Sequence, residues 1–151
     1  MRSSHASIPV FVPHVGCPQR CSFCDQNTIS GAYGMPSPQE AAEICRRGLD
    51  ELPDKFPKAE IAFFGGSFTA IPRREMEGLL EAVQPLRNHP RFGGIRISTR
   101  PDALSVEIIG ILKKAGVQAI ELGAQSLYNE VLEANGRGHT AQDVVAAAAL
   151  V

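Results

Sequence analysis

The sequence predicts an α/β fold in which four parallel strands alternate with helices. Four short apolar segments of strand length are each followed by a segment with an apolar face at helical spacing. Connections of this kind join parallel strands and place the helices outside the sheet. At 151 residues, with 44% hydrophobic and 21% charged residues, the chain has the size and composition of one globular domain.

The first strand–helix unit contains a long loop. Residues 8–12 are predicted to form a buried strand, and residues 13–36 a loop rich in Gly, Pro, Asn and Ser. A loop of this length in a compact domain usually has a function. Ser37 and Glu40 form a capping box that begins the next helix, with Pro38 at its first position. The apolar face of this helix carries Ala41, Ile44, Cys45, Gly48, Leu49 and Leu52.

The next two units repeat the pattern. Strands are expected at 61–64 and 95–98. Pro85 should disturb the last turn of the first of the two helices, and Gly116 should cap the end of the second. The first helix presents Met76, Leu79, Leu80 and Val83 on one face, and the second presents Leu104, Ile108, Ile111, Leu112 and Ala115.

The fourth unit begins with a strand at 118–122. Ser126 is expected to cap a helix that continues to about Asn135, and Gly136 to end it. Thr140 is expected to cap a final Ala-rich helix.

Composition and charge bear on three questions: nucleic-acid binding, membrane insertion and the cellular compartment of the protein. A net charge of −1 gives no overall basic field that would indicate nucleic-acid binding. The N-terminus lacks a secretory apolar region, and the longest apolar tract, residues 144–151, is too short to span a bilayer. Four cysteines, three of them clustered, indicate a reduced compartment and metal binding rather than disulfides. We therefore expect a cytoplasmic protein with no membrane partner.

The clustered cysteines are Cys17, Cys21 and Cys24, at C-x3-C-x2-C spacing within eight residues. Thiolates this close can converge on one metal centre. A structural zinc site or an ordinary iron–sulfur cluster takes four protein ligands, whereas three thiolates on a four-iron cluster leave one iron open. The alternative is a zinc-binding interaction module in which His14 completes the site. Cys45 lies on an apolar helix face and is interpreted as a small core residue.

This spacing, with Phe23 just before the last cysteine, resembles the signature of radical S-adenosylmethionine (radical SAM) enzymes. The chain looks like the bacterial proteins related to the elongator catalytic subunit, and more distantly like oxygen-independent coproporphyrinogen oxidases. The strings at 63–69, 97–102 and 120–126 extend the match in the expected order. One departure concerns the substrate. The elongator subunit has a longer gap between its first two cysteines, and no acetyltransferase region follows here.

The resemblance implies a [4Fe–4S] cluster held by Cys17, Cys21 and Cys24, with S-adenosylmethionine (SAM) on the open iron. The reduced cluster would cleave SAM to a 5′-deoxyadenosyl radical that abstracts hydrogen from a substrate. It also implies an electron donor such as flavodoxin or ferredoxin. The substrate stays open between RNA, as in tRNA modification, and tetrapyrrole-type chemistry.

The resemblance also assigns SAM contacts, and each has an ordinary structural alternative. Phe23 could be packing, and the glycine pair could simply end a strand. Residues 98–100 could cap the next helix, and Arg137 could be solvated. The glycine pair allows close backbone approach, which a Cβ atom would obstruct. The cofactor-binding residues implied are Phe23, Gly65, Gly66, Ser67, Ser98, Gln125 and Arg137.

The fold implied is a partial (βα) barrel of the radical SAM type with about four βα units present. The family core usually has six strands, so residues 1–151 are expected to be the N-terminal portion of the core domain. A strand at 118–122 would then be an unpaired edge, and exposed edges tend to pair with other chains. We therefore expect the 151-residue chain alone to self-associate or to be only marginally stable, and to turn over no substrate. An inactive truncated cluster-binding fragment is a third interpretation.

Overall fold

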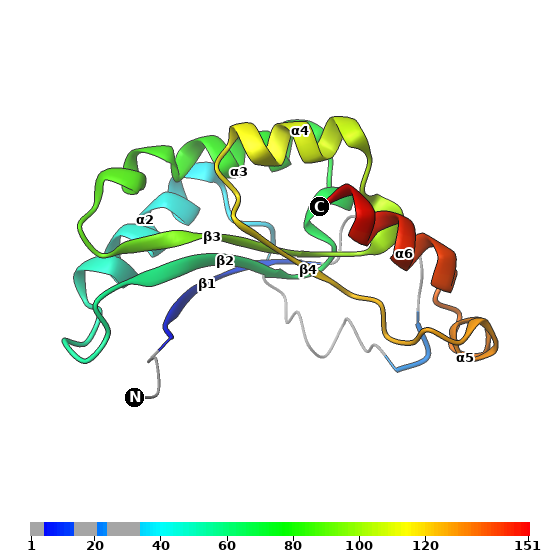
Figure 1. Ribbon diagram of the computed structural model, residues 1–151. Helices are drawn as coiled ribbons and strands as arrows, with labels where there is room; N and C mark the ends of the chain where they lie inside the picture. The colour runs from blue at the N-terminus through cyan, green and yellow to red at the C-terminus, as the bar shows by residue number, and fades with distance from the viewer. Residues whose placement is uncertain (1–4, 14–20, 24–33) are drawn as a thin grey trace.

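The computed structural model describes residues 5–13, 21–23 and 34–151. Its centre is a parallel sheet in the order β1-β2-β3-β4, which is the order of the strands along the chain (Figure 1). The strands are β1 (Ser7–Val12), β2 (Ala59–Gly65), β3 (Phe92–Thr99) and β4 (Ala119–Leu122). The predicted α/β architecture with four strand–helix units is confirmed.

Three helices cover one face of the sheet: α2 (Pro38–Asp50), α3 (Arg73–Ala82) and α4 (Val106–Lys114) (Figure 1). After β4 the chain forms α5 (Asn129–Ala134) and α6 (Ala141–Leu150), and α6 packs near the short 3-10 turn Pro101–Ala103 that follows β3. Further 3-10 turns are Phe68–Ala70 and Gln84–Asn88. Helices on one face leave the opposite face of the sheet open in the described part of the chain.

Alternate strand residues separate the two faces of the sheet, because side chains alternate along a strand. The side chains that face the helices form the core and are fully or almost fully buried: Val10, Val12, Ile61, Phe63, Ile95 and Ile97. Burying each such side chain contributes on the order of 1.5–3 kcal/mol. The open face instead carries the edge-to-face pair Phe11 and Phe64 and the polar residues Arg96, Ser98 and Glu121.

The caps of α2 and α6 are as predicted. Ser37 Oγ accepts from the Glu40 N–H, the Glu40 carboxylate accepts from the Ser37 N–H, and Pro38 is the first helical residue. Thr140 and Asp143 form the same reciprocal box at α6. Each box satisfies backbone donors that the first helical turn leaves without a partner.

The start of α5 corrects one prediction. Ser126 does not cap this helix, which begins at Asn129 with Tyr128 in the cap position. The Ser126 hydroxyl accepts from the Tyr128 N–H, two residues on. Serine favours such short-range turns as well as helix caps, and the turn prevails here. Gly136, which adopts φ +62, follows the helix as predicted.

The predicted ends of α3 and α4 hold. Helix α3 ends at Ala82, and Pro85 lies in the 3-10 turn that follows. Gly116 adopts φ +78 directly after the cap residue of α4. Leu104, predicted on the face of α4, lies before the helix, because Ser105 caps it by accepting from the Ile108 N–H.

Cys45 is a core residue, as predicted. It is fully buried on α2, and burial raises the pKa of its thiol to about 12. A thiol with such a pKa stays protonated at neutral pH and is a poor metal ligand. Within the described ranges, no helix is long and apolar enough to cross a membrane.

Candidate functional site

A cavity of about 280 Å³ lies at the carboxyl ends of the strands. This is the edge at which (βα) folds build their sites, because the loops that follow parallel strands meet there. Its lining comes from residues 21–23, from the ends of β2, β3 and β4 and from the segments beyond β4: Cys21, Phe23, Gly65, Gly66, Ser67, Ser98, Thr99, Arg100, Glu121, Leu122, Gly123, Gln125 and Arg137.

The cavity gathers the predicted site residues that the structure describes. Cys21 and all seven predicted cofactor-binding residues line it, although they come from positions as far apart as 21 and 137. Cys17, Cys24 and His14 lie outside the described residues. One cysteine of the motif therefore lies among the expected cofactor contacts.

The glycine pair forms one wall of the cavity by a tight approach of β2 to β1. Gly65 adopts φ +110, and a Cβ atom there would lie 2.5 Å from Phe11 Cε2 and 2.8 Å from the Val12 carbonyl oxygen. The Gly66 N–H donates to that same oxygen at 2.7 Å. Only glycine fits position 65, because both the backbone conformation and the space exclude a side chain.

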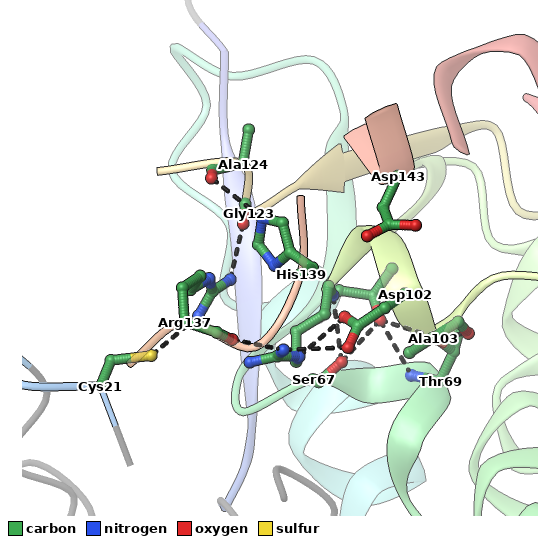
Figure 2. Close-up of polar contacts among 12 residues, drawn as sticks. Cys21, Ser67, Thr69, Asp102, Ala103, Gly123, Ala124, Arg137, His139 and Asp143 are labelled. Atoms are coloured by element: carbon green, nitrogen blue, oxygen red, sulfur yellow. Dashed lines mark hydrogen bonds and ion pairs between the residues drawn. The ribbon is translucent and has the colours of Figure 1, made fainter. Parts of the chain in front are cut away.

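A chain of buried hydroxyl groups begins at Ser67, directly after the glycine pair, and two of its members, Ser67 and Thr69, are labelled in Figure 2. Thr99 Oγ1 lies 2.8 Å from Ser67 Oγ and 2.6 Å from Thr69 Oγ1. Thr69 in turn donates to the Ala103 carbonyl oxygen at 2.7 Å. The chain therefore fixes the end of β2 to the end of β3. The sequence argument did not single out Thr69, and only its place in the 63–69 string marked it.

Ser98 lies on the open face and contacts a carboxylate. Its hydroxyl donates to Glu121 Oε2 at 2.8 Å, and Arg96 Nη1 donates to Glu121 Oε1 at 2.6 Å. The Ser98 hydrogen bond, followed by that from Arg96, lowers the pKa of Glu121 below its ordinary value. The cavity thus has an ionised carboxylate on the β4 side.

Arg100 is buried, with 3% of its surface exposed. Its Nε and Nη2 donate to the two carboxylate oxygens of Asp102, each at 2.9 Å, and Nη2 also donates to the Arg137 carbonyl oxygen at 2.7 Å. Its own N–H donates to Ser67 Oγ at 3.0 Å. Sequence reasoning placed residues 98–100 at a strand end but did not predict this pair. The acidic residue two positions after the arginine was the available signal.

Arg137 reaches into the cavity from the loop after α5 and is only 8% exposed (Figure 2). Its Nη2 donates to the Gly123 carbonyl oxygen at 2.6 Å, and its Nη1 lies 3.4 Å from Cys21 Sγ. Its Nε is buried without a hydrogen-bond partner among the described residues. Arg137 is therefore a buried loop residue at the cavity rather than a solvated surface arginine, and its role toward a cofactor stays a prediction.

His139, two residues after Arg137, contacts the backbone at the residue after Gly123. Its Nε2 lies 3.1 Å from the Ala124 carbonyl oxygen, so this nitrogen carries the proton. Burial is the main cause that holds the pKa of His139 below its ordinary value. Gln125, which follows the acceptor residue Ala124, adopts φ +65, a conformation that non-glycine residues seldom take. Sequence reasoning did not assign His139 a role.

The sequence is similar to those of a known protein family and of several known proteins. The radical SAM superfamily pattern matches residues 11–151. The chain is 36% identical over 102 residues to the tRNA uridine(34) acetyltransferase of Methanocaldococcus infernus, covering 64% of this chain and 19% of that protein. It is also 36% identical over 152 residues to the oxygen-independent coproporphyrinogen-III oxidase-like protein HemZ of Bacillus subtilis, covering 92% of this chain and 29% of that protein.

A solved structure supports the fold. The archaeal Methanocaldococcus infernus Elp3 with an N-terminal deletion superposes with a TM-score of 0.64 at 23% identity, over 97% of this chain and 35% of that one. The chain therefore spans between about a fifth and a third of the proteins it resembles here. The match of the superfamily pattern to nearly the whole sequence, on the fold that this structure shares, establishes that the chain belongs to the radical SAM superfamily.

Proposed function

We propose that this protein is a radical SAM enzyme that holds a [4Fe–4S] cluster on Cys17, Cys21 and Cys24 and binds SAM in the cavity at the strand ends. The observation that carries the proposal is the gathering of Cys21 with Phe23, Gly66, Ser98, Gln125 and Arg137 around one cavity. In this proposal residues 1–151 are the N-terminal portion of the core domain, and the activity belongs to the whole protein.

The described residues fit such a cofactor in chemistry and in space. Cys21 is 5% exposed and lines the cavity, and its sulfur lies 3.4 Å from the guanidinium group of Arg137, so a sulfur ligand of the motif and a cation stand side by side at the proposed site. The unpartnered Nε of Arg137 is a buried donor for which an anionic ligand would be a suitable partner. The volume of about 280 Å³ is close to the lower end, roughly 300 Å³, for small-molecule sites.

When bound, the cluster and SAM supply one-electron chemistry that generates a radical able to abstract hydrogen. The residues of this chain bind and orient the cofactor. Arg137 offers positive charge to a carboxylate, and Glu121 offers acceptors to hydroxyl groups. Gly66 leaves room for close backbone approach, and Phe23, 52% exposed at the cavity, offers an aromatic face.

The similar proteins suggest two substrate classes. One bears the name of a tRNA uridine(34) acetyltransferase and the other of a coproporphyrinogen oxidase-like protein. These names are the basis on which tRNA or a tetrapyrrole precursor is proposed as the substrate class. A cytoplasmic location and an electron donor of the flavodoxin or ferredoxin type complete the proposal.

Metal analysis of anaerobically reconstituted protein tests the proposal. We expect about four irons and four sulfides per chain. Changing Cys17, Cys21 or Cys24 to Ala should remove most of the iron, whereas Cys45→Ala should retain it, because Cys45 is buried on α2 with a pKa of about 12. The iron content should be expressed per mole of folded protein, with the folded fraction measured by circular dichroism. A loss of stability in the Cys45 variant is then not mistaken for the loss of a metal ligand.

Two outcomes would contradict the proposal. The first is stoichiometric zinc without sulfide in protein purified without added metal, which would favour the zinc-binding module. The second is equal iron loss in Cys21→Ala and Cys45→Ala at equal folded content, because the cysteine motif would then have no special role.

A further inference from the structure

We propose that Arg100 is a positioning residue that acts through the backbone of Arg137 and sets the contact of the Arg137 guanidinium with Cys21. The proposal rests on the proposed function for its effect on the cluster. Its structural part, the fixing of the Arg137 loop, can be measured without any metal.

Arg100 is fixed at both ends, so it can transmit position. Its N–H donates to Ser67 Oγ at 3.0 Å, which attaches it to the hydroxyl chain between β2 and β3. Its guanidinium group is oriented by the two parallel hydrogen bonds to Asp102. A planar guanidinium paired in this way has little freedom to rotate.

The same guanidinium group holds the loop after α5. Arg100 Nη2 donates to the Arg137 carbonyl oxygen at 2.7 Å, across 37 residues of sequence. From that anchored backbone the Arg137 side chain reaches the Gly123 carbonyl oxygen and Cys21 Sγ. The sheet is thereby connected to the cysteine through two arginines in series.

The charges assign different tasks to the two arginines. The charge of Arg100 is balanced by Asp102. Arg137 has no carboxylate partner among the described residues, and its nearest groups are a carbonyl oxygen and a sulfur atom. The positive charge of Arg137 therefore faces the cysteine and the cavity, and Arg100 sets the position of the Arg137 guanidinium group.

Position matters because the contact is short and polar. A cationic donor beside a thiolate ligand stabilises the more negative, reduced state of a cluster and raises its reduction potential. Lysine at position 100 would keep the charge, but an ammonium group cannot reproduce the bidentate contact with Asp102 together with the third bond to Arg137. The Arg137 loop would then shift, and the potential would fall.

The experiment compares Arg100→Lys, Arg137→Gln and the double variant of the 151-residue chain. Arg91→Lys is the matched control, because Arg91 also holds a loop by carbonyl oxygens, those of Leu52 and Pro53, but lies just before β3 at the opposite end of the sheet. Anaerobic redox titration followed by EPR gives the cluster potential, and amide hydrogen exchange of metal-free protein gives the protection of residues 123 and 137.

We expect Arg100→Lys to lower the reduction potential of the cluster by up to about 59 mV. For a one-electron couple this corresponds to a tenfold change in the equilibrium constant for reduction. Because both arginines act on the same contact, the double variant should match Arg137→Gln alone. Hydrogen exchange at 123 and 137 should become at least about tenfold faster in Arg100→Lys and stay unchanged in Arg91→Lys.

Unchanged exchange at 123 and 137 in Arg100→Lys would overturn the proposal, as would additive shifts of potential in the double variant. A wild-type chain that takes up no iron or sulfide would instead contradict the proposed function. The exchange measurement would then still decide whether Arg100 fixes the Arg137 loop.

Discussion

Arg137 Nη1 lies 3.4 Å from Cys21 Sγ, which joins two buried side chains 116 positions apart in the sequence. The cysteine belongs to the loop after β1, and the arginine follows α5. Between them in the sequence lie the strands β2, β3 and β4 with the helices that connect them. The candidate site is therefore a product of the whole sheet rather than of the cysteine motif alone.

Gly123→Ala tests the placement of Arg137. A Cβ atom at position 123 would lie 3.0 Å from Arg137 Nη2, so the guanidinium group must move by a few tenths of an ångström. We expect SAM binding to weaken by about three- to tenfold, equivalent to roughly 0.7–1.4 kcal/mol. The free energy of unfolding should change little, because the end of a flexible side chain gives way. Calorimetric titration with SAM and urea unfolding measure the two effects.

Gly110→Ala is the matched control for that substitution. Gly110 lies inside α4 on an exposed position, and nothing lies within 4 Å of the Cβ atom that the change adds. We expect unchanged SAM binding and a gain in stability of about 0.5–1 kcal/mol. Equal SAM affinities in the two variants would show that Gly123 does not set the position of Arg137.

Gly66→Val tests the glycine wall of the cavity. Gly66 lines the cavity and its N–H donates to the Val12 carbonyl oxygen, so a branched side chain would occupy the space beside the strand end. We expect SAM binding to weaken at least tenfold, about 1.4 kcal/mol, while the cluster is retained. The measurement is the change that SAM induces in the EPR signal of the reduced cluster. A wild-type response in the variant would remove Gly66 from the site.

Thr99→Val tests the chain of buried hydroxyl groups at the cavity, formed by Ser67, Thr69 and Thr99. Valine has nearly the same shape but leaves the buried hydroxyls of Ser67 and Thr69 without their shared partner. We expect a loss of about 1–3 kcal/mol in the free energy of unfolding, because unsatisfied buried polar groups are costly. Urea unfolding of Ser98→Ala is the comparison, since Ser98 is less buried and its hydroxyl donates to Glu121, outside the buried hydroxyl chain. A cost in Thr99→Val no larger than in Ser98→Ala would argue against the chain's structural role.

His139 should make stability depend on pH. Its pKa lies below the ordinary value of 6.5, mainly because of burial, so below about pH 6.5 the unfolded chain binds more protons than the folded one. The free energy of unfolding should therefore be fully retained above that pH and fall as the pH decreases through the window between 6.5 and the lower folded pKa. Urea unfolding at several values between about pH 8 and pH 5 measures this loss.

His139→Gln provides the control for the pH dependence. Glutamine keeps a side-chain donor for the Ala124 carbonyl oxygen but does not titrate. The stability of this variant should fall less steeply with decreasing pH than that of the wild type. Parallel curves for the two proteins would mean that other groups cause the pH dependence.

Local patterns predicted the elements well where the deciding forces are local. The capping boxes at Ser37 and Thr140 and the glycine at 116 act within a few residues of themselves, so their effects can be inferred from spacing. Ser126 shows the limit of such inference. A serine before a helix can cap it or bond two residues ahead, and the path of the chain from β4 to α5 favoured the second.

The sequence alone determined the alternation of four strands and helices and the buried position of Cys45, because burial follows from periodicity. The seven predicted cofactor contacts that line the cavity came from the family resemblance, and the lining residues Thr99, Arg100, Leu122 and Gly123 were not among them. Only the tertiary structure decided that Arg100 pairs with Asp102 and holds the Arg137 carbonyl, and that Arg137 contacts Cys21. A buried arginine satisfies its donors with whichever acceptors surround it, and those acceptors become neighbours only when distant strands have docked.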